Sequence, residues 1–151
     1  MKISIDNVTK KFGERTVVDR LNLDVADGGL TVLLGPSGCG KTTTLRMLAG
    51  LEKIDSGEIY FDSNAVSQMS PKQRNVAMVF QDYGLYPHMS VLNNVTFPLK
   101  IANVPKSKRE DIARSLLKRF GIDQLSSRKP GLISGGEKQR VSLARALVRH
   151  P

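Results

Sequence analysis

The chain has little cysteine, no tryptophan and no long apolar stretch. Cys39 is the only cysteine among 151 residues, so no internal disulfide can form, which suits a reducing compartment. No stretch approaches the roughly 20 apolar residues that a transmembrane helix needs. The first residues also lack the apolar run of a secretory signal. We therefore expect a protein that begins life in the cytosol.

Acidic residues are scarce in the last third of the chain. Residues 101–151 carry 12 Lys and Arg against 4 Asp and Glu, whereas residues 1–100 carry 11 against 10. Such a surplus is compatible with nucleic-acid binding. However, the interleaved aromatic side chains of a base-stacking surface are missing there. We interpret the surplus as solvated helix faces and expect no nucleic-acid partner.

Apolar patterning predicts an α/β fold that starts with strands. Alternating apolar and polar residues indicate half-buried strands, whereas short continuous apolar runs are typical of strands buried on both faces. The predicted strands are residues 3–8, 21–25, 30–34, 57–61 and 76–80. Residues 42–49 follow a glycine-rich loop and are predicted to form a helix that ends at Gly50.

Two capping boxes predict helices in the second half of the chain. Ser107–Glu110 opens one helix, which Gly121 closes, and Ser134–Glu137 opens another. The first helix has an apolar face made of Ile112, Leu116, Leu117 and Phe120. We expect a strand-rich part at residues 1–87, a helical part at 88–133, and a helix from 134 that returns toward the first part.

Gly35–Thr42 matches the phosphate-binding motif G-x-x-x-x-G-K-[ST] between a predicted strand and a predicted helix. Glycines let several backbone N–H groups converge on one anion, and the helix N-terminus adds partial positive charge. We predict that Lys41 reaches the β- and γ-phosphates, that Thr42 ligates Mg²⁺, and that Thr43 donates to a phosphate. Cys39 is either a small filler of this loop or a thiol that nucleotide would protect from alkylation. The predicted nucleotide-binding residues here are Gly35, Pro36, Ser37, Gly38, Cys39, Gly40, Lys41, Thr42 and Thr43.

A second motif resembles a known family. Residues 133–137, Ile-Ser-Gly-Gly-Glu, resemble the LSGGQ signature of ABC-transporter ATPases, and residues 138–147 continue the similarity. Gln81 stands where that family has its Q-loop glutamine, and Phe12 stands where it stacks an aromatic ring on adenine. Residues 83–91 look most like the sugar-importer branch, although polyamine and iron importers are similar in this segment. The resemblance covers essentially the whole chain.

The resemblance implies a P-loop NTPase core with an antiparallel β part and a helical insertion. It implies ATP and Mg²⁺ as cofactors, with Lys41 and Gln81 as catalytic residues and with Thr42 and Gln81 near the metal. In the family, two ATPase subunits pair head to tail, as a homodimer or with a related subunit. The residues that would contact the ATP of the other subunit are Ser134, Gly135, Gly136 and Glu137.

Further expectations concern location and partners. The resemblance implies transmembrane permease subunits and a peripheral position at the cytoplasmic face of the membrane. The segment Tyr86–Met89 is a candidate for docking on a permease, or equally an anchor for its own loop. Glu137 replaces the usual glutamine of the signature, which adds negative charge near a phosphate site.

Hydrolysis in the family needs an apolar strand that ends in Asp-Glu, because these carboxylates help hold Mg²⁺ and polarise water. No such strand occurs in residues 1–151; Ile59–Asp62 comes nearest, but Ser63 follows it. We expect a carbohydrate-import ATPase in the full-length protein. Residues 1–151 alone should bind ATP, hydrolyse it poorly or not at all, and have an incomplete core. The alternative is a catalytically inactive nucleotide-binding fragment or interaction module.

Overall fold

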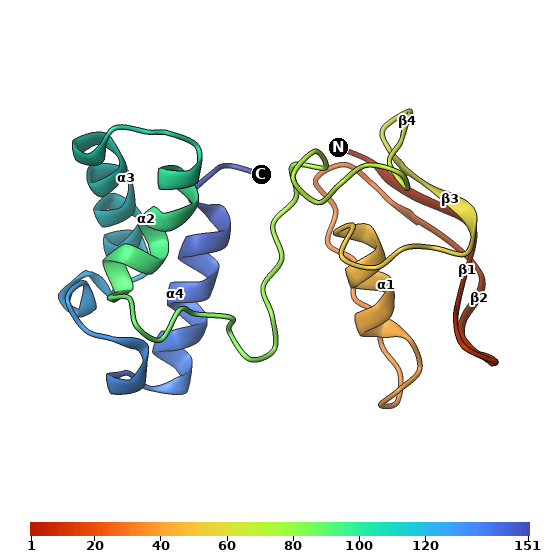
Figure 1. Ribbon diagram of the computed structural model, residues 1–151, viewed down its shortest axis with the longest axis horizontal. Coiled ribbons are helices and arrows are strands. Elements are labelled where there is room, and N and C mark those ends of the chain that lie inside the picture. Colours follow the sequence, from red (N-terminus) through yellow and green to blue (C-terminus); the bar gives the residue numbers. More distant parts are fainter. The chain divides into compact units, whose positions relative to one another are not determined.

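The computed structural model describes all residues from Met1 to Pro151. Its backbone divides into two compact units, Met1–Val76 and Ala77–Pro151, which are called the N-terminal and C-terminal units below. The N-terminal unit combines a β-sheet with one helix, and the C-terminal unit is helical (Figure 1). Each unit is described by itself. The predicted α/β class is confirmed.

The sheet of the N-terminal unit is antiparallel throughout. It has the strand order β2-β1-β3-β4, with β1 (Ile3–Phe12) between β2 (Arg15–Val25) and β3 (Ser56–Phe61). The short strand β4 (Asn64–Ala65) pairs with β3. The strands predicted at 3–8, 21–25 and 57–61 are therefore confirmed within longer elements. Gly57 lies where a Cβ would come 2.4 Å from the Asn7 carbonyl oxygen, so only glycine lets β1 and β3 approach this closely.

Helix α1 (Lys41–Leu48) covers one face of this sheet, as Figure 1 shows. Its residue Met47 is buried in the core of the unit. The strands and the segment after β4 supply the other core residues: Ile5, Val8, Val18, Ile59, Phe61 and Val66. The predicted stop is confirmed, because Gly50 has φ 72° and donates its N–H to the Met47 carbonyl over 3.1 Å.

The strands predicted at 30–34 and 76–80 are wrong for this structure. Both segments are irregular, and neither belongs to the sheet. The side chains of Leu30 and Leu34 are 92% and 88% exposed. A strand exists only when its backbone N–H and C=O groups pair with a neighbouring strand, and neither run is paired in the sheet. Hydrophobic sequence alone does not supply that neighbour.

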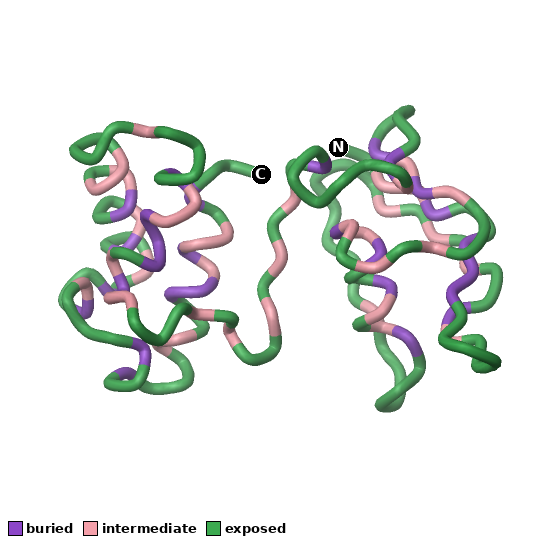
Figure 2. Tube along the Cα trace, in the orientation of Figure 1, coloured by how far each residue is buried: buried purple, intermediate pink, exposed green.

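The C-terminal unit is built from three helices: α2 (Val91–Ile101), α3 (Lys106–Arg119) and α4 (Gly135–Leu147). Two short 3₁₀ turns, η1 (Asp123–Leu125) and η2 (Pro130–Leu132), connect α3 to α4. The tube in Figure 2 shows buried residues recurring along these helices. The core comprises Val91, Val95, Leu99, Ala113, Leu117, Ile122, Leu125, Ile133, Val141, Ala144 and Val148.

The start of α3 differs from the prediction. The box predicted at Ser107–Glu110 does not form: α3 already begins at Lys106, after Pro105, and no side chain caps it. Pro105 is the N-cap residue, with φ −54° and ψ 147°, so Ser107 already lies inside the first turn and cannot cap the helix. The predicted end is confirmed, since Gly121 follows the last turn with φ 63°. None of the helices is long and apolar enough to cross a bilayer.

Candidate nucleotide-binding site

The loop Gly35–Thr42, called the phosphate loop below, leads directly into α1. Gly38 and Gly40 have φ values of 80° and 95°, in the left-handed region that favours glycine. Gly40 caps α1 without any side-chain hydrogen bond. The first intrahelical bond runs from the Thr44 N–H to the Gly40 carbonyl over 2.8 Å. The N–H groups of residues 41–43, in the first turn of α1, therefore have no acceptor within the helix and can donate to an external one. This is the arrangement that binds anions.

Two glycines of the phosphate loop have a close neighbour at the position of a Cβ. A Cβ on Gly40 would lie 2.7 Å from the Val17 carbonyl oxygen of β2. A Cβ on Gly35 would lie 2.8 Å from the Cys39 sulfur. Gly38 differs, because nothing lies within 4 Å of the position of its Cβ. The loop is thus pressed against β2 at Gly40 and open at Gly38.

The Lys41 ammonium folds back over the phosphate loop. Its Nζ donates to the carbonyl oxygens of Gly35 and Pro36, each over 2.7 Å. The Cys39 sulfur lies 3.5 Å from the same nitrogen, and Cys39 is exposed. Neutral carbonyls are weaker acceptors for an ammonium than phosphate oxygens are. Lys41 is therefore held over the loop by partners that an incoming phosphate can replace.

The three threonines of α1 face different surroundings. Thr44 is buried and donates its hydroxyl to the Gly40 carbonyl over 3.0 Å, so it fastens the loop to the helix. Thr42 is exposed, and Thr43 is half-buried. No group of three or more His, Cys, Asp or Glu side chains is placed to hold a metal ion. Mg²⁺ in phosphate sites commonly uses one or two protein ligands plus phosphate and water, and the exposed Thr42 hydroxyl fits that mode.

Phe12 stands at the end of β1, where the chain turns into β2. Phe12 is 49% exposed, and the Lys10 ammonium lies 5.0 Å from the centroid of its ring. Lys10 is itself fixed by Glu52 at 2.9 Å, and this hydrogen bond raises the pKa of Lys10. Phe12 pairs with Arg15, and Val17 two residues further on touches Gly40. The turn that carries Phe12 is thus joined to the phosphate loop through β2.

The segment Ser134–Glu137, called the signature segment below, opens α4. The predicted capping box is confirmed: the Ser134 hydroxyl accepts from the Glu137 N–H, and the Glu137 carboxylate accepts from the Ser134 N–H over 2.7 Å. Gly136 has nothing within 4 Å of the position of its Cβ, so its backbone is open. Gly135 faces the Tyr83 hydroxyl, which would lie 3.2 Å from a Cβ there.

Gln81 lies in the turn 81–84 of the C-terminal unit and is exposed. The structure brings the phosphate loop and the turn of Phe12 together in the N-terminal unit. Gln81 and the signature segment share the other unit. The nucleotide contacts of all these residues, and the return of the helix from 134 toward the first part of the chain, remain predictions.

Two arginines of structural importance were missed by the sequence analysis. Arg74 is only 5% exposed and donates to the carbonyls of Met47 and Leu48 at the end of α1, over 2.6 and 3.0 Å. Arg145 on α4 holds the backbone of the turn after Gln81. Nothing in the local sequence distinguishes either arginine from the solvated cations around it.

A glycine loop that enters a helix, with a lysine folded over exposed first-turn amides, defines a nucleotide-binding protein of the P-loop class. The particular family follows from comparison with known proteins. The chain belongs to the ABC transporter family, because the model of that family matches residues 18–151.

Curated relatives match nearly the full chain. The chain is 48% identical to the trehalose/maltose import ATP-binding protein MalK of Thermococcus litoralis, over 99% of this chain and 42% of that protein. It is 47% identical to the sn-glycerol-3-phosphate import ATP-binding protein UgpC 1 of Rhizobium johnstonii, with coverages of 99% and 40%. It is 49% identical to the trehalose import ATP-binding protein SugC of Mycobacterium tuberculosis, with coverages of 99% and 38%. The chain thus spans about two fifths of the length of these relatives.

Solved structures agree with this assignment. The ATP-binding cassette MJ0796, in a dimeric post-hydrolysis state bound to ADP and Pi, superimposes with a TM-score of 0.88 at 31% identity, over 99% of this chain and 70% of that chain. A second dimeric structure of the same cassette gives a TM-score of 0.88 at 32% identity. The predicted family and fold are therefore confirmed.

Proposed function

We propose that this chain is the ATP-binding part of the energy-coupling subunit of an ABC importer for carbohydrate. The observation that carries the proposal is the phosphate loop, where Lys41 lies over a loop whose first-turn amides have no partner in the helix. The three relatives above are named for the import of sugars or glycerol phosphate. Their similarity supports the carbohydrate class of cargo.

Nucleotide binding begins with exchange of partners at Lys41. The ammonium leaves the carbonyls of Gly35 and Pro36 for the β- and γ-phosphates of ATP. The N–H groups at the start of α1 then donate to the same phosphates. The Lys10 ammonium lies 5.0 Å from the centroid of the Phe12 ring. The exposed part of Phe12 is positioned to stack on adenine.

Mg²⁺, when bound with ATP, neutralises charge on the phosphates and holds them in one orientation. Thr42 is the residue that would ligate it, and Gln81 is proposed to contact the metal or the attacking water. Hydrolysis further needs carboxylates in the order Asp-Glu, which does not occur in residues 1–151. We therefore propose ATP hydrolysis for the complete protein and binding with little turnover for residues 1–151.

The signature segment supplies the second half of the site. We propose that two copies, or this chain and a related subunit, pair head to tail so that Ser134, Gly135 and Gly136 of one face the ATP of the other. MJ0796 is a dimer, which supports pairing in general. The proposed partners of the pair are transmembrane permease subunits, with the ATPase peripheral at the cytoplasmic face of the membrane.

Titration with Mg-ATP tests the proposal. We expect saturable binding by isothermal calorimetry or a fluorescent ATP analogue. Lys41→Ala should weaken it at least tenfold, because charge-assisted hydrogen bonds to phosphate contribute roughly 1.5–3 kcal/mol. Arg46→Ala is the matched control, since it removes an exposed cation from the same helix and should leave affinity within twofold. Absence of saturable binding, or equal binding by Lys41→Ala, would refute the proposed function.

The alternative is a catalytically inactive nucleotide-binding module, and it makes a different prediction. The complete gene product would then bind Mg-ATP without turning it over. Phosphate release by the complete gene product, abolished by Lys41→Ala, supports the importer ATPase. Binding without release supports the inactive module.

A further inference from the structure

Side chains of helix α4 donate hydrogen bonds to the backbone of the turn that follows Gln81. The Arg145 guanidinium donates to the Gly84 carbonyl over 2.7 Å and to the Tyr83 carbonyl over 3.2 Å. The Ser142 hydroxyl donates to the same Tyr83 carbonyl over 2.9 Å. Three hydrogen bonds from one helix therefore converge on two consecutive carbonyls, only two and three residues after Gln81. We call this set of contacts the turn clamp.

The turn clamp depends on an unusual backbone conformation. Tyr83 and Gly84 have φ values of 65° and 56°, so two successive residues lie in the left-handed region. A Cβ on Gly84 would come 3.2 Å from the Phe80 ring and 3.3 Å from the Arg145 guanidinium. Tyr83 also touches the start of α4, where its hydroxyl lies 3.2 Å from the position of a Gly135 Cβ. The spacing of Gly135, Ser142 and Arg145 places the three contacts on one helix face.

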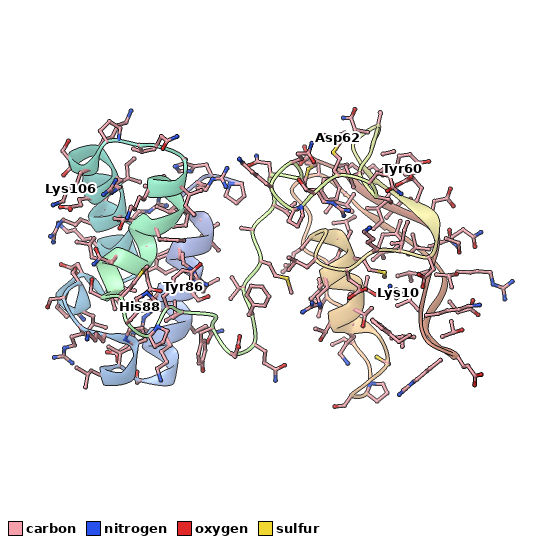
Figure 3. All side chains as sticks on the ribbon, viewed as in Figure 1. Lys10, Tyr60, Asp62, Tyr86, His88 and Lys106 are labelled. Atoms are coloured by element: carbon pink, nitrogen blue, oxygen red, sulfur yellow. The ribbon has the colours of Figure 1, made fainter.

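Placing the charged Arg145 side chain at this position costs free energy of desolvation. It is half-buried, and none of the ion pairs of the structure includes it. Burial lowers its pKa, which shows that the surroundings disfavour the charge. Its compensation comes from the two carbonyls and from the Tyr86 ring, 5.6 Å from the guanidinium carbon; Tyr86 is labelled beside α4 in Figure 3. An apolar side chain would fill this space without the cost of desolvation.

The planar guanidinium has one property that an apolar residue or lysine lacks. Its rigid fork places two donors at fixed geometry, so it fixes two carbonyls relative to each other and to the helix. Asn94 holds the far end of the same segment, since its side chain accepts from the Tyr86 N–H over 2.8 Å and donates to the Tyr86 carbonyl over 3.1 Å. The chain from Tyr83 to Tyr86 is thus bound to α4 and α2 by its backbone.

We propose that Arg145 is a positioning residue that ties the orientation of Gln81 to the signature helix α4. The role of Gln81 in this statement rests on the proposed function. Gln81 precedes the two clamped carbonyls by two and three residues, and the signature segment begins the helix that carries the clamp. Movement of the helix tip toward a nucleotide therefore carries the Gln81 turn with it. The guanidinium acts on the reaction through Gln81 and touches neither nucleotide nor metal.

Steady-state ATPase kinetics of the complete gene product test the functional half of this proposal. We expect Arg145→Met to lower kcat about tenfold or more while KM changes less than threefold, because binding by the phosphate loop is unaffected. Arg145→Lys keeps the charge but loses the fork, so its kcat should lie between those of the wild type and Arg145→Met. Arg149→Met is the control, since it removes an exposed arginine four residues along the chain, and it should stay within twofold of the wild type.

A double mutant shows whether Arg145 acts through Gln81. If it does, Arg145→Met combined with Gln81→Ala is no slower than Gln81→Ala alone. If the two substitutions reduce kcat independently, so that their fold-reductions multiply in the double mutant, the proposal is overturned. An Arg145→Met enzyme with kcat within twofold of the wild type would also overturn it.

Hydrogen exchange tests the clamp even if the proposed function fails. In Arg145→Met, the amides of residues 82–85 should exchange at least tenfold faster, while the core amides of α2 and α3 keep their rates. Uniform acceleration across residues 77–151 would assign Arg145 a purely stabilising role and overturn the positioning role. Unchanged exchange at residues 82–85 would also overturn it. A wild-type gene product without ATPase activity would refute the proposed function but leave this measurement decisive for the clamp.

Discussion

The Glu137 carboxylate engages both donors of Ser134. It accepts from the Ser134 backbone N–H over 2.7 Å and from the Ser134 hydroxyl over 2.8 Å. These bonds, the backbone one first, lower the pKa of Glu137. The single hydroxyl proton of Ser134 is therefore directed into its own capping box. An incoming phosphate at this helix tip competes with Glu137 for the Ser134 hydroxyl proton. The carboxylate that replaces the family's glutamine therefore occupies a donor of the site and also adds negative charge to it.

The first prediction concerns the pH dependence of folding. Because the folded-state pKa of Glu137 lies below its unfolded value of about 4.3, its stabilising effect is complete above the unfolded pKa and disappears as pH falls through the folded pKa. Glu137→Gln keeps the capping box but removes the titration. Unfolding midpoints in urea from pH 7 to pH 3 should show the wild-type advantage over Glu137→Gln shrinking below about pH 4.3.

Glu14→Gln serves as the control for this titration, since Glu14 is exposed in the turn between β1 and β2. It controls for the general effect of replacing an exposed carboxylate by an amide. A Glu137→Gln difference that does not vary with pH would show that the capping box does not bind the ionised carboxylate preferentially.

The second prediction separates backbone strain from crowding in the phosphate loop. Gly38→Ala should lose stability only because alanine disfavours the left-handed conformation, since no atom lies within 4 Å of the Cβ position. We expect about 1 kcal/mol of lost stability. Gly40→Ala adds a clash with the Val17 carbonyl at 2.7 Å, so the loss should reach about 3 kcal/mol. Chemical denaturation of both variants measures the difference; equal losses would mean that β2 yields freely at Val17.

The third prediction concerns Arg74, which closes the C-terminal end of α1. It donates to the Met47, Leu48, Met69 and Ser67 carbonyls over 2.6–3.1 Å. Arg74→Met removes the side-chain donor from all four carbonyls, of which Met47 keeps the Gly50 N–H, and should lower the free energy of unfolding by about 3 kcal/mol. Arg46→Met, at an exposed arginine of α1, should change it by less than about 0.5 kcal/mol. Thermal or urea unfolding of the two variants provides the test, and similar small effects would contradict the assigned role.

The fourth prediction uses Cys39 as a reporter of nucleotide binding. Cys39 is the only thiol and is exposed, with its sulfur 3.5 Å from the Lys41 nitrogen. We expect one equivalent of a maleimide to react, and we expect Mg-ATP to slow the reaction at least fivefold by covering the loop. In Lys41→Ala the protection should need far more ATP. Equal labelling rates with and without saturating Mg-ATP would place the nucleotide elsewhere.

Local signals predicted local structure well. The helix after the phosphate loop, its Gly50 stop and the capping box at Ser134–Glu137 all formed as the sequence predicted, because each depends on residues within one or two turns. Helix α2 was missed, although Ser90 caps it and Val91, Val95 and Leu99 follow at helical spacing. In α3, the box expected at Ser107 does not form, because the helix begins at Lys106 and Ser107 lies inside its first turn.

Features that depend on distant partners were not predictable. The runs at 30–34 and 76–80 have the composition of buried strands, yet strand formation needs a neighbour that composition does not provide. Arg74 and Arg145 bind carbonyls 5 to 62 residues away in sequence, and no motif marks either residue. Of the candidate site, the phosphate loop and the signature segment were evident because their chemistry is confined to short motifs.

The exposed run at 30–34 ends at Gly35, the first residue of the phosphate loop. Exposed apolar side chains beside unpaired peptide groups favour pairing with the strand edge of another chain, so we expect copies of the chain to associate through this run at high concentration. Any β-ladder that captures it also fixes the entrance of the loop. We therefore expect strand addition at this run and phosphate binding by the loop to be thermodynamically linked.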